Sequence, residues 1–146
     1  AENFVRSSQM NKRRLHCKMC QAPLTVPLEL DDEVRPFKYG PQDDSLKIPV
    51  GDAWIIERLP IRQTLSREKE IWFSPKSLTD QVVTDQNTFG CCGHTGRNNT
   101  RCKCGHIIGS RIDECAHQPR FEPNSKMTYW ATSSVSETDS EIARSR

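Results

Sequence analysis

Seven cysteines fall into two clusters, one on either side of residues 21–90, and this layout constrains the fold more than any other feature of the chain. The first cluster is the Cys17-x-x-Cys20 pair. The second holds five cysteines with three histidines among them: Cys91, Cys92, His94, Cys102, Cys104, His106, Cys115 and His117. Two thiolates at such short spacing can hold one edge of a tetrahedral Zn²⁺, and a second close pair can hold the other edge.

Each cluster contains a segment with the form of a zinc knuckle, a tight turn whose backbone N–H groups point at the metal-binding sulfurs. Cys17–Cys20 is the first, and Cys102–Gly105 is the best partner for it, although Cys-x-Cys is one residue shorter than the usual pair. Gly105 can adopt the left-handed conformation that often closes such a turn. We therefore predict one Zn²⁺, with a second ion allowed by the remaining cysteines. The predicted ligands are Cys17, Cys20, Cys102 and Cys104.

The composition of the chain favours such a cross-link. Only 34% of its 146 residues are hydrophobic, against roughly 45–50% in an ordinary globular chain, so the core is small for this length. Closing the loop between the two clusters costs on the order of 4 kcal/mol of chain entropy. A structural zinc site returns roughly 10–16 kcal/mol. Zinc coordination therefore outweighs loop closure and can dominate the stability of the domain.

Three other uses of the cysteines remain open. A local metal site can form within the second cluster; its ligands would be Cys91 or Cys92, His94, Cys102 and Cys104, with Cys115 as a further backup ligand. A disulfide network is expected instead if the chain is secreted, and Asn98–Thr100 would then also be a glycosylation sequon. Ligation by thiolates alone also suits an iron–sulfur cluster.

Three cysteines are surplus to a four-cysteine site, namely Cys91, Cys92 and Cys115. One interpretation is that they are small buried apolar residues, as free cysteines often are. The other is that Cys115, close in sequence to Asp113 and His117, is a reactive thiol. A nucleophile needs a nearby base or a positive field to stabilise its thiolate, and proximity in sequence does not supply that contact.

The chain is expected to form one domain between two polar ends. Residues 1–14 are interpreted as a flexible basic arm, residues 15–130 as the zinc-binding β domain, and residues 131–146 as a disordered Ser/Thr-rich tail. The net charge of +2 gives no general argument for nucleic-acid or membrane binding, and no run of about 18 apolar residues is present. A cytoplasmic location is expected, because cytosolic thiols stay reduced and available to metal.

Between these ends the apolar pattern favours strands and little helix. The expected strands are Leu24–Leu30, Ala53–Leu59, Ile71–Phe73, His106–Ile112, Pro119–Pro123 and Lys126–Trp130. The segments between them are interpreted as an acidic turn at Asp31–Glu33, a loop over Phe37–Pro49 and a short helix over Arg62–Glu70, while Ser77–Gln86 fits either helix or strand. Trp54, Trp72 and Trp130 are interpreted as core residues.

Cys17–Leu24 and Cys102–Ile112 resemble the early and late knuckles of the β-tent zinc proteins, which include the cereblon-type ligand-binding domain, the Yippee proteins and the B-type methionine sulfoxide reductases. The series around Cys91-Cys92, Cys102–Gly105 and Asp113–Cys115 is also similar to that of uncharacterised cysteine-rich bacterial proteins. The β-tent resemblance implies a mostly β domain of two packed antiparallel sheets, pinned at one end by a four-cysteine zinc site. Neither an aromatic ligand cage nor reductase activity is carried over, because Ser110 replaces the usual tryptophan and the catalytic cysteine motif has no match.

Three functions follow from these observations. The leading one is a zinc-stabilised, non-catalytic binding or adaptor module for a partner protein, since no acid–base pair, phosphate loop or catalytic triad is evident. The first alternative is a thiol-dependent enzyme or redox sensor that uses Cys115 or the Cys91/Cys92 pair. The second alternative is a nucleic-acid-binding zinc protein that uses basic residues near the knuckles and the arm: Lys12, Arg13, Arg14, Arg97, Arg101 and Lys103. Membrane binding is not expected.

Overall fold

The fold was analysed in a computed structural model, which describes residues 12–37, 46–58, 69–85, 98–113 and 119–133. Within these ranges the chain is mostly β, as predicted. The elements are β1 Lys12–Cys17, β2 Leu28–Phe37, β3 Asp52–Arg58, β4 Lys69–Phe73, the 3₁₀ turn η1 Pro75–Ser77, β5 Val82–Thr84, β6 Thr100–Cys102, β7 Ile107–Ile112, β8 Arg120–Pro123 and β9 Thr128–Thr132. Among the described elements there is no helix with the length and apolar character needed to span a bilayer.

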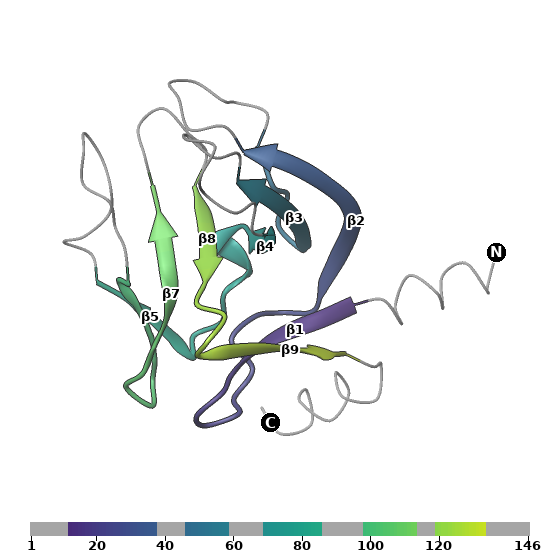
Figure 1. Cartoon of the computed structure of the whole chain (residues 1–146). Coiled ribbons are helices and arrows are strands. Elements are labelled where there is room, and N and C mark those ends of the chain that lie inside the picture. Colours follow the sequence, from purple (N-terminus) through teal and green to yellow (C-terminus); the bar gives the residue numbers. More distant parts are fainter. Residues whose placement is uncertain (1–11, 38–45, 59–68, 86–97, 114–118, 134–146) are drawn as a thin grey trace.

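The described strands form one hydrogen-bonded sheet in the order β5-β6-β7-β8-β4-β3-β2-β1-β9, not the two separate sheets that the sequence predicts. The joint between its two halves is narrow, because β4 and β8 pair only through Phe73 and Phe121. The rings of these two residues pack with their centroids 5.1 Å apart, which joins the halves into one ladder. Figure 1 shows the resulting strong curvature, with β1 and β9 crossing below the strands of the other half.

The pairing of β2 with β3 is parallel, which corrects the prediction of purely antiparallel sheets. A parallel connection needs a crossover of about a dozen residues or more, and the segment 38–51 between these strands is long enough. The sequence shows the length of this segment but not the direction in which the chain returns. Each of the other strand pairs in the described sheet is antiparallel.

Strand β2 begins later and runs further than the sequence predicts. It starts at Leu28, immediately after Pro27, which lacks the N–H that a ladder requires. The predicted acidic turn is instead a bulge within the strand, where the register with β3 shifts between Asp31 and Val34. At this bulge the Asp31 carboxylate accepts a hydrogen bond from the N–H of Glu33 at 2.9 Å. This is the local turn that an aspartate favours, here accommodated in a strand.

The sheet extends beyond the expected domain boundaries at both ends. Strand β1 already begins at Lys12, inside the predicted arm, and β9 ends at Thr132, inside the predicted tail. These two strands pair with each other over five residue pairs, from Arg13 with Thr132 to Cys17 with Thr128. The polar sequence concealed β1, whose buried apolar side chains are those of Leu15 and Cys17, whereas β9 overlaps the predicted strand Lys126–Trp130. Residues 1–11 and 134–146, and residues 62–68 of the predicted helix, lie outside the described part.

The buried residues gather in two clusters on opposite faces of the sheet. Phe73 belongs to the larger cluster and its neighbour Trp72 to the smaller one, since successive side chains of a strand point to opposite faces. The larger cluster also contains Cys17 and Cys102, so half of the predicted metal ligands are core residues. Trp72 is fully buried as predicted, whereas Trp54 and Trp130 only pack against the edges of the two clusters.

Gly109 occupies a point on β7 where β8 approaches so closely that a side chain does not fit. A Cβ atom there would lie 2.6 Å from the backbone oxygen of Glu122 and 2.6 Å from the ring of Phe121. We expect Gly109→Ala to lower the free energy of unfolding by about 1–3 kcal/mol, the range for overpacked sites. Chemical denaturation measures this, with the exposed Val83→Ala as a control that should change little. An unchanged denaturation midpoint for Gly109→Ala would show that β7 and β8 can move apart to fit a side chain with no loss of stability.

Candidate metal centre

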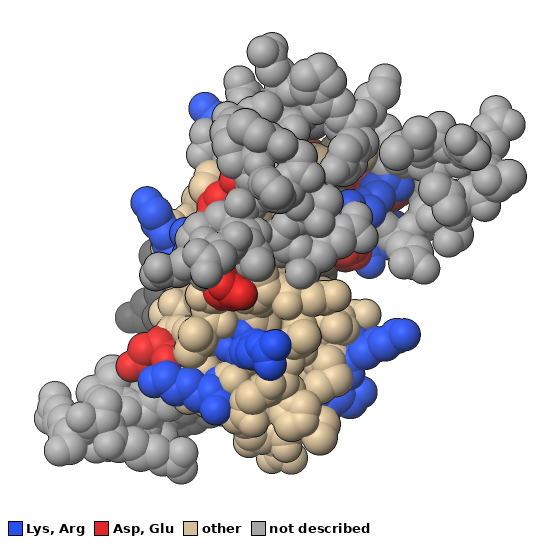
Figure 2. Space-filling model, turned by 90° about the vertical axis from the view of Figure 1, so that its left-hand side faces the viewer, with Lys and Arg blue, Asp and Glu red and all other residues tan. Residues whose placement is uncertain are grey.

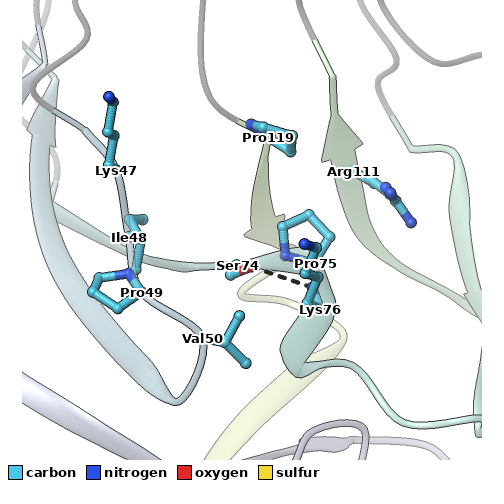
Figure 3. Close-up of a pocket in the computed structure, with 9 residues that line it drawn as sticks. All are labelled: Lys47, Ile48, Pro49, Val50, Ser74, Pro75, Lys76, Arg111 and Pro119. Carbon is cyan, nitrogen blue, oxygen red and sulfur yellow. Dashed lines mark hydrogen bonds between the residues drawn. The ribbon is translucent and has the colours of Figure 1, made fainter.

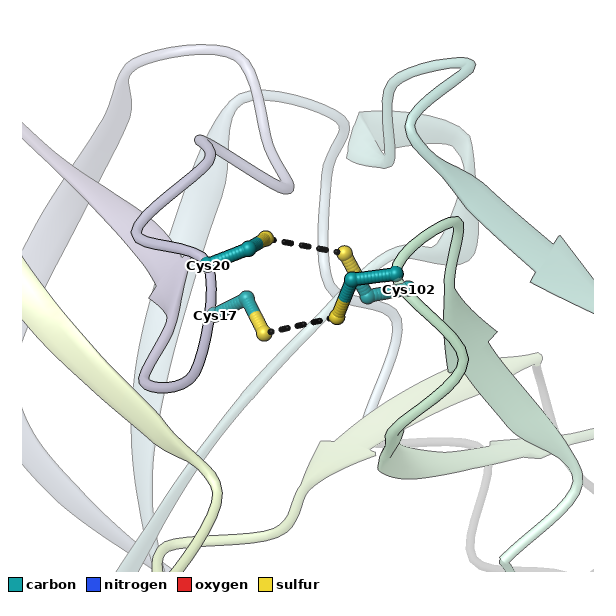
Figure 4. Close-up of side chains that lie close together, drawn as sticks. Cys17, Cys20 and Cys102 are labelled. Atoms are coloured by element: carbon teal, nitrogen blue, oxygen red, sulfur yellow. Dashed lines mark hydrogen bonds between the residues drawn. The ribbon is translucent and has the colours of Figure 1, made fainter.

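The structure brings together the four cysteines predicted as metal ligands. Cys17 ends β1, Cys20 follows in the first knuckle, Cys102 ends β6, and Cys104 follows in the second knuckle. Their four Sγ atoms all lie within 4.8 Å of one another. Two Sγ–Sγ contacts run between the knuckles, at 3.6 Å from Cys17 to Cys104 and 3.5 Å from Cys20 to Cys102 (Figure 4).

These separations suit a metal ion better than disulfide bonds. A tetrahedral ion with Zn–S bonds of about 2.3 Å places its sulfurs about 3.8 Å apart. A disulfide needs sulfurs at about 2.05 Å, and all four cysteines are free. The cluster is buried on one side and exposed on the other, because Cys17 and Cys102 are buried while Cys20 and Cys104 are exposed. An ion can therefore enter from solvent and still anchor the core.

The site joins two strands that are far apart in the sheet. Five strands, β7, β8, β4, β3 and β2, separate β6 from β1 in the hydrogen-bonding order. The ends of β1 and β6 nevertheless meet, because Cys17 and Cys102 end these strands and their Sγ atoms lie within 4.8 Å of each other. Figure 4 shows Cys17 and Cys20 facing Cys102 across this junction. The second knuckle is also held to the segment before β5, because the Lys103 N–H donates to the Gln81 oxygen at 2.9 Å. A metal ion bound by all four cysteines would link the end of β1 to the end of β6.

The two knuckles close with the same backbone hydrogen bond and a residue of positive φ, although their cysteines are spaced differently. In the first, the N–H of Gln21 donates to the oxygen of Cys17 at 2.7 Å, and Gln21 has a φ of 64°. In the second, the N–H of Gly105 donates to the oxygen of Cys102 at 2.8 Å, and Gly105 has a φ of 100°. The residue after the last cysteine is therefore left-handed in both, as predicted for Gly105.

This shared geometry predicts opposite effects for two substitutions. Gln21→Gly should raise the free energy of unfolding by about 0.5 kcal/mol, because glycine adopts a positive φ without the strain that glutamine bears. Gly105→Ala should lower it by about 1 kcal/mol through backbone strain alone, since a Cβ atom there meets nothing within 4 Å. Thermal unfolding of both metal-loaded variants measures these effects. Shifts of the same sign would contradict the matched geometry of the knuckles.

Backbone N–H groups point at the sulfurs, as expected for zinc knuckles, and they act on the thiol acidities. Burial alone would raise the pKa of the Cys102 thiol, but the Cys104 N–H, the Gln81 amide and neighbouring thiols lower it to about 7. The Ala22 N–H lowers the pKa of Cys20, yet burial and hydrogen bonds shared with the other three thiols raise it to about 12. The lowered pKa of Cys102 favours its thiolate, whereas the thiolate of Cys20 needs a compensating cation, which a divalent metal supplies.

Gln81 is a part of the site that the sequence did not predict, whereas the described histidines are hydrogen-bonded neighbours rather than members of the cysteine cluster. The Gln81 amide donates to Cys102 Sγ at 3.4 Å, and no motif in the sequence identifies it. His106 Nδ1 lies 3.3 Å from Cys104 Sγ, which makes it a neighbour of the site rather than a fifth member of the cluster. His16 stacks on Tyr129 and contacts the oxygen of Gln21. The backup ligands and the remaining histidine, namely Cys91, Cys92, His94, Cys115 and His117, lie outside the described residues.

The basic residues considered for nucleic-acid binding do not form a free arm in the described part. Lys12, Arg13 and Arg14 belong to β1, and Arg14 is buried. Arg101 and Lys103 are exposed beside the second knuckle, and Arg97 lies outside the described residues. In Figure 2 the described Lys and Arg side chains are scattered over the face shown, some of them beside Asp or Glu, and do not gather into one patch.

Comparison of the chain with protein-family models, with curated proteins and with solved structures finds no match in any of the three.

Proposed function

We propose that the four cysteine thiolates bind one structural Zn²⁺ and that the domain is a non-catalytic module for binding a partner protein. The observation that carries the first part is the gathering of four Sγ atoms within 4.8 Å at the point where β1 and β6 meet. A site filled by four cysteines leaves no open position for a substrate, which is the pattern of structural rather than catalytic zinc.

The binding role is supported by the chemistry of the described residues. Their only cluster of three or more metal-ligating side chains is the cysteine site itself. Met19 is 58% exposed at the tip of the first knuckle, in the turn between Cys17 and Cys20. Methionine is common at protein-binding surfaces because its side chain adapts to different partners. The knuckle tip is therefore where we expect a partner protein to make contact.

We further propose a β-tent type of architecture and a cytoplasmic location. The arrangement of an early knuckle after β1 and a late knuckle between β6 and β7 supports the first of these proposals. The narrow β4–β8 joint also fits a fold whose two halves act as separate layers. The cytoplasmic location is supported by the need to keep four thiols reduced for the metal.

Zinc content and thiol reactivity, measured on the purified chain, test the proposal. We expect one zinc per chain by native mass spectrometry, and slow alkylation of Cys17, Cys20, Cys102 and Cys104 until a chelator is added. Cys91, Cys92 and Cys115 should react no faster than a free cysteine standard. Much faster labelling of Cys115 would contradict the non-catalytic role and favour a thiol-dependent enzyme or redox sensor.

The partner is tested by photo-crosslinking from position 19 of the zinc-loaded chain, with the same probe at the exposed position 83 as a control. A protein captured from position 19 and not from position 83, and lost after chelation, is the expected result. Capture from both positions alike, or capture that survives unfolding, would contradict a specific contact at the knuckle. Salt-sensitive binding of a nucleic-acid duplex would instead favour the nucleic-acid alternative.

A further inference from the structure

A cavity of about 400 Å³ opens on the sheet at a place that uses none of the metal ligands (Figure 3). Lys47–Val50, which precede β3, line one side of it, and Arg111 of β7 lies on the opposite side. Ser74–Lys76, at the 3₁₀ turn, lie between them, and Pro119 covers a further wall. The volume falls in the range of small-molecule sites, roughly 300–1,000 Å³.

The residues that line the cavity provide both apolar surface and positive charge. Ile48, Val50 and three prolines supply the apolar surface, while Lys47, Lys76 and Arg111 supply three cations. None of the nine lining residues is acidic. Arg111 Nε binds the Asp113 carboxylate at 3.0 Å, and Lys47 and Lys76 add two further positive charges to the lining. An excess of one sign around a concave surface attracts ligands of the opposite sign.

The remaining polar group in the lining also favours an acceptor. Ser74 is only 7% exposed, and its Oγ caps the 3₁₀ turn by accepting the N–H of Lys76 at 3.3 Å. The Ser74 oxygen accepts this one hydrogen bond, and its hydroxyl proton can donate to an acceptor on a ligand. The cavity therefore offers a hydroxyl donor and cationic donors, and its walls are held by prolines that lose little freedom on binding.

We propose that this cavity binds a small organic anion, a carboxylate or phosphate head group on an apolar body. The head group lies among Lys47, Lys76 and the Ser74 hydroxyl, and the apolar body rests on Ile48 and Val50. This site is independent of the metal centre and of the partner-binding role proposed above. Val50, which is 58% exposed although it is apolar, is the wall residue that such a ligand would cover.

The proposal is tested by isothermal titration of the full zinc-loaded chain at low ionic strength with three probes: 4-phenylbutanoate, phenyl phosphate and the neutral 4-phenylbutan-1-ol. We expect one equivalent of at least one anion to bind, and the alcohol to bind at least about tenfold more weakly. The tighter of the two anions identifies the head group. Binding of the alcohol as tight as that of the anions, or no binding of any probe at millimolar concentration, would overturn the proposal.

Matched variants locate the site. Val50→Glu places a carboxylate in the cavity and should abolish anion binding, whereas Val83→Glu, at an equally exposed valine of β5, should leave it unchanged. Lys47→Gln and Lys76→Gln should each weaken binding about threefold, a typical effect for one exposed charge, while Lys126→Gln should not. Zinc content and melting midpoint confirm that each variant is folded. Equal effects of Val50→Glu and Val83→Glu would show that the anion binds elsewhere.

Discussion

Cys17→Ser and Cys104→Ser are each expected to abolish zinc binding and to unfold the domain. Each substitution removes one of four thiolates from a site whose apparent binding free energy is roughly 10–16 kcal/mol. The total stability of a domain is about 5–15 kcal/mol, so little remains when the site fails. Native mass spectrometry measures the metal, and circular dichroism with thermal melting measures the fold.

The control for these variants is Cys115→Ser, which makes the same chemical change at a cysteine outside the predicted ligand set. We expect this variant to keep one zinc and the melting midpoint of the unsubstituted chain. Retention of zinc and fold in Cys17→Ser would contradict the site between the two knuckles and favour a local site in the second cluster. Loss of zinc in Cys115→Ser would show that Cys115 is a further ligand, which would contradict a site made of Cys17, Cys20, Cys102 and Cys104 alone.

The second large effect is expected in an ion-pair network at the β4–β8 joint. Glu122 of β8 binds the guanidinium groups of both Arg58 and Arg120, the latter at 2.7 Å, and Arg58 also binds Glu70. Both guanidinium carbons lie 4.9 Å from the ring centre of the buried Trp72. Burial would lower the pKa of Arg58, but the two carboxylates raise it above its usual value. The network therefore holds two cations against a buried aromatic ring through one shared carboxylate.

Glu122→Gln should lower the free energy of unfolding by about 3 kcal/mol, because it leaves buried guanidinium charge without its partner. The side chain of Glu122 is 11% exposed and that of Arg120 is 5% exposed, so water cannot replace the lost carboxylate. Chemical denaturation of the zinc-loaded variant gives the value.

The matched control is Glu33→Gln, which removes the same charge from a surface pair. Glu33 is 71% exposed where it meets Arg35, so we expect a change below about 0.5 kcal/mol. Equal effects of Glu122→Gln and Glu33→Gln would show that burial adds nothing to the network.

The parts of the molecule that short-range chemistry determines could be predicted from the sequence. The two knuckles follow from cysteine spacing, and Gly105 was identified from its need for a positive φ. Strands β3, β4 and β7 follow from apolar, β-branched runs that end at turn residues, such as Phe73 before the Ser74 cap. Each of these features is encoded within a few neighbouring residues.

The parts that depend on distant partners could not be predicted in the same way. Strand β1 was missed because its charged residues Lys12–Arg14 suggest a solvated arm, and pairing with β9 and β2 makes it a strand. Strand β6 has three residues and no apolar alternation, and it is held between β5 and β7. The parallel β2–β3 pair and the single β4–β8 pairing at Phe73 depend on how distant strands are arranged in the sheet, which no local pattern in the sequence determines. Gln81 is a hydrogen-bond donor to the site only because β5 lies beside β6.

The most direct test of the account is X-ray absorption spectroscopy at the zinc edge of the purified, metal-loaded chain. The account predicts one zinc per chain with four sulfur neighbours at about 2.3 Å and no nitrogen or oxygen neighbour. A first shell that contains nitrogen or oxygen, or a chain that is folded without any bound metal, would contradict the claim that four thiolates from the two ends of the sheet close it around one ion.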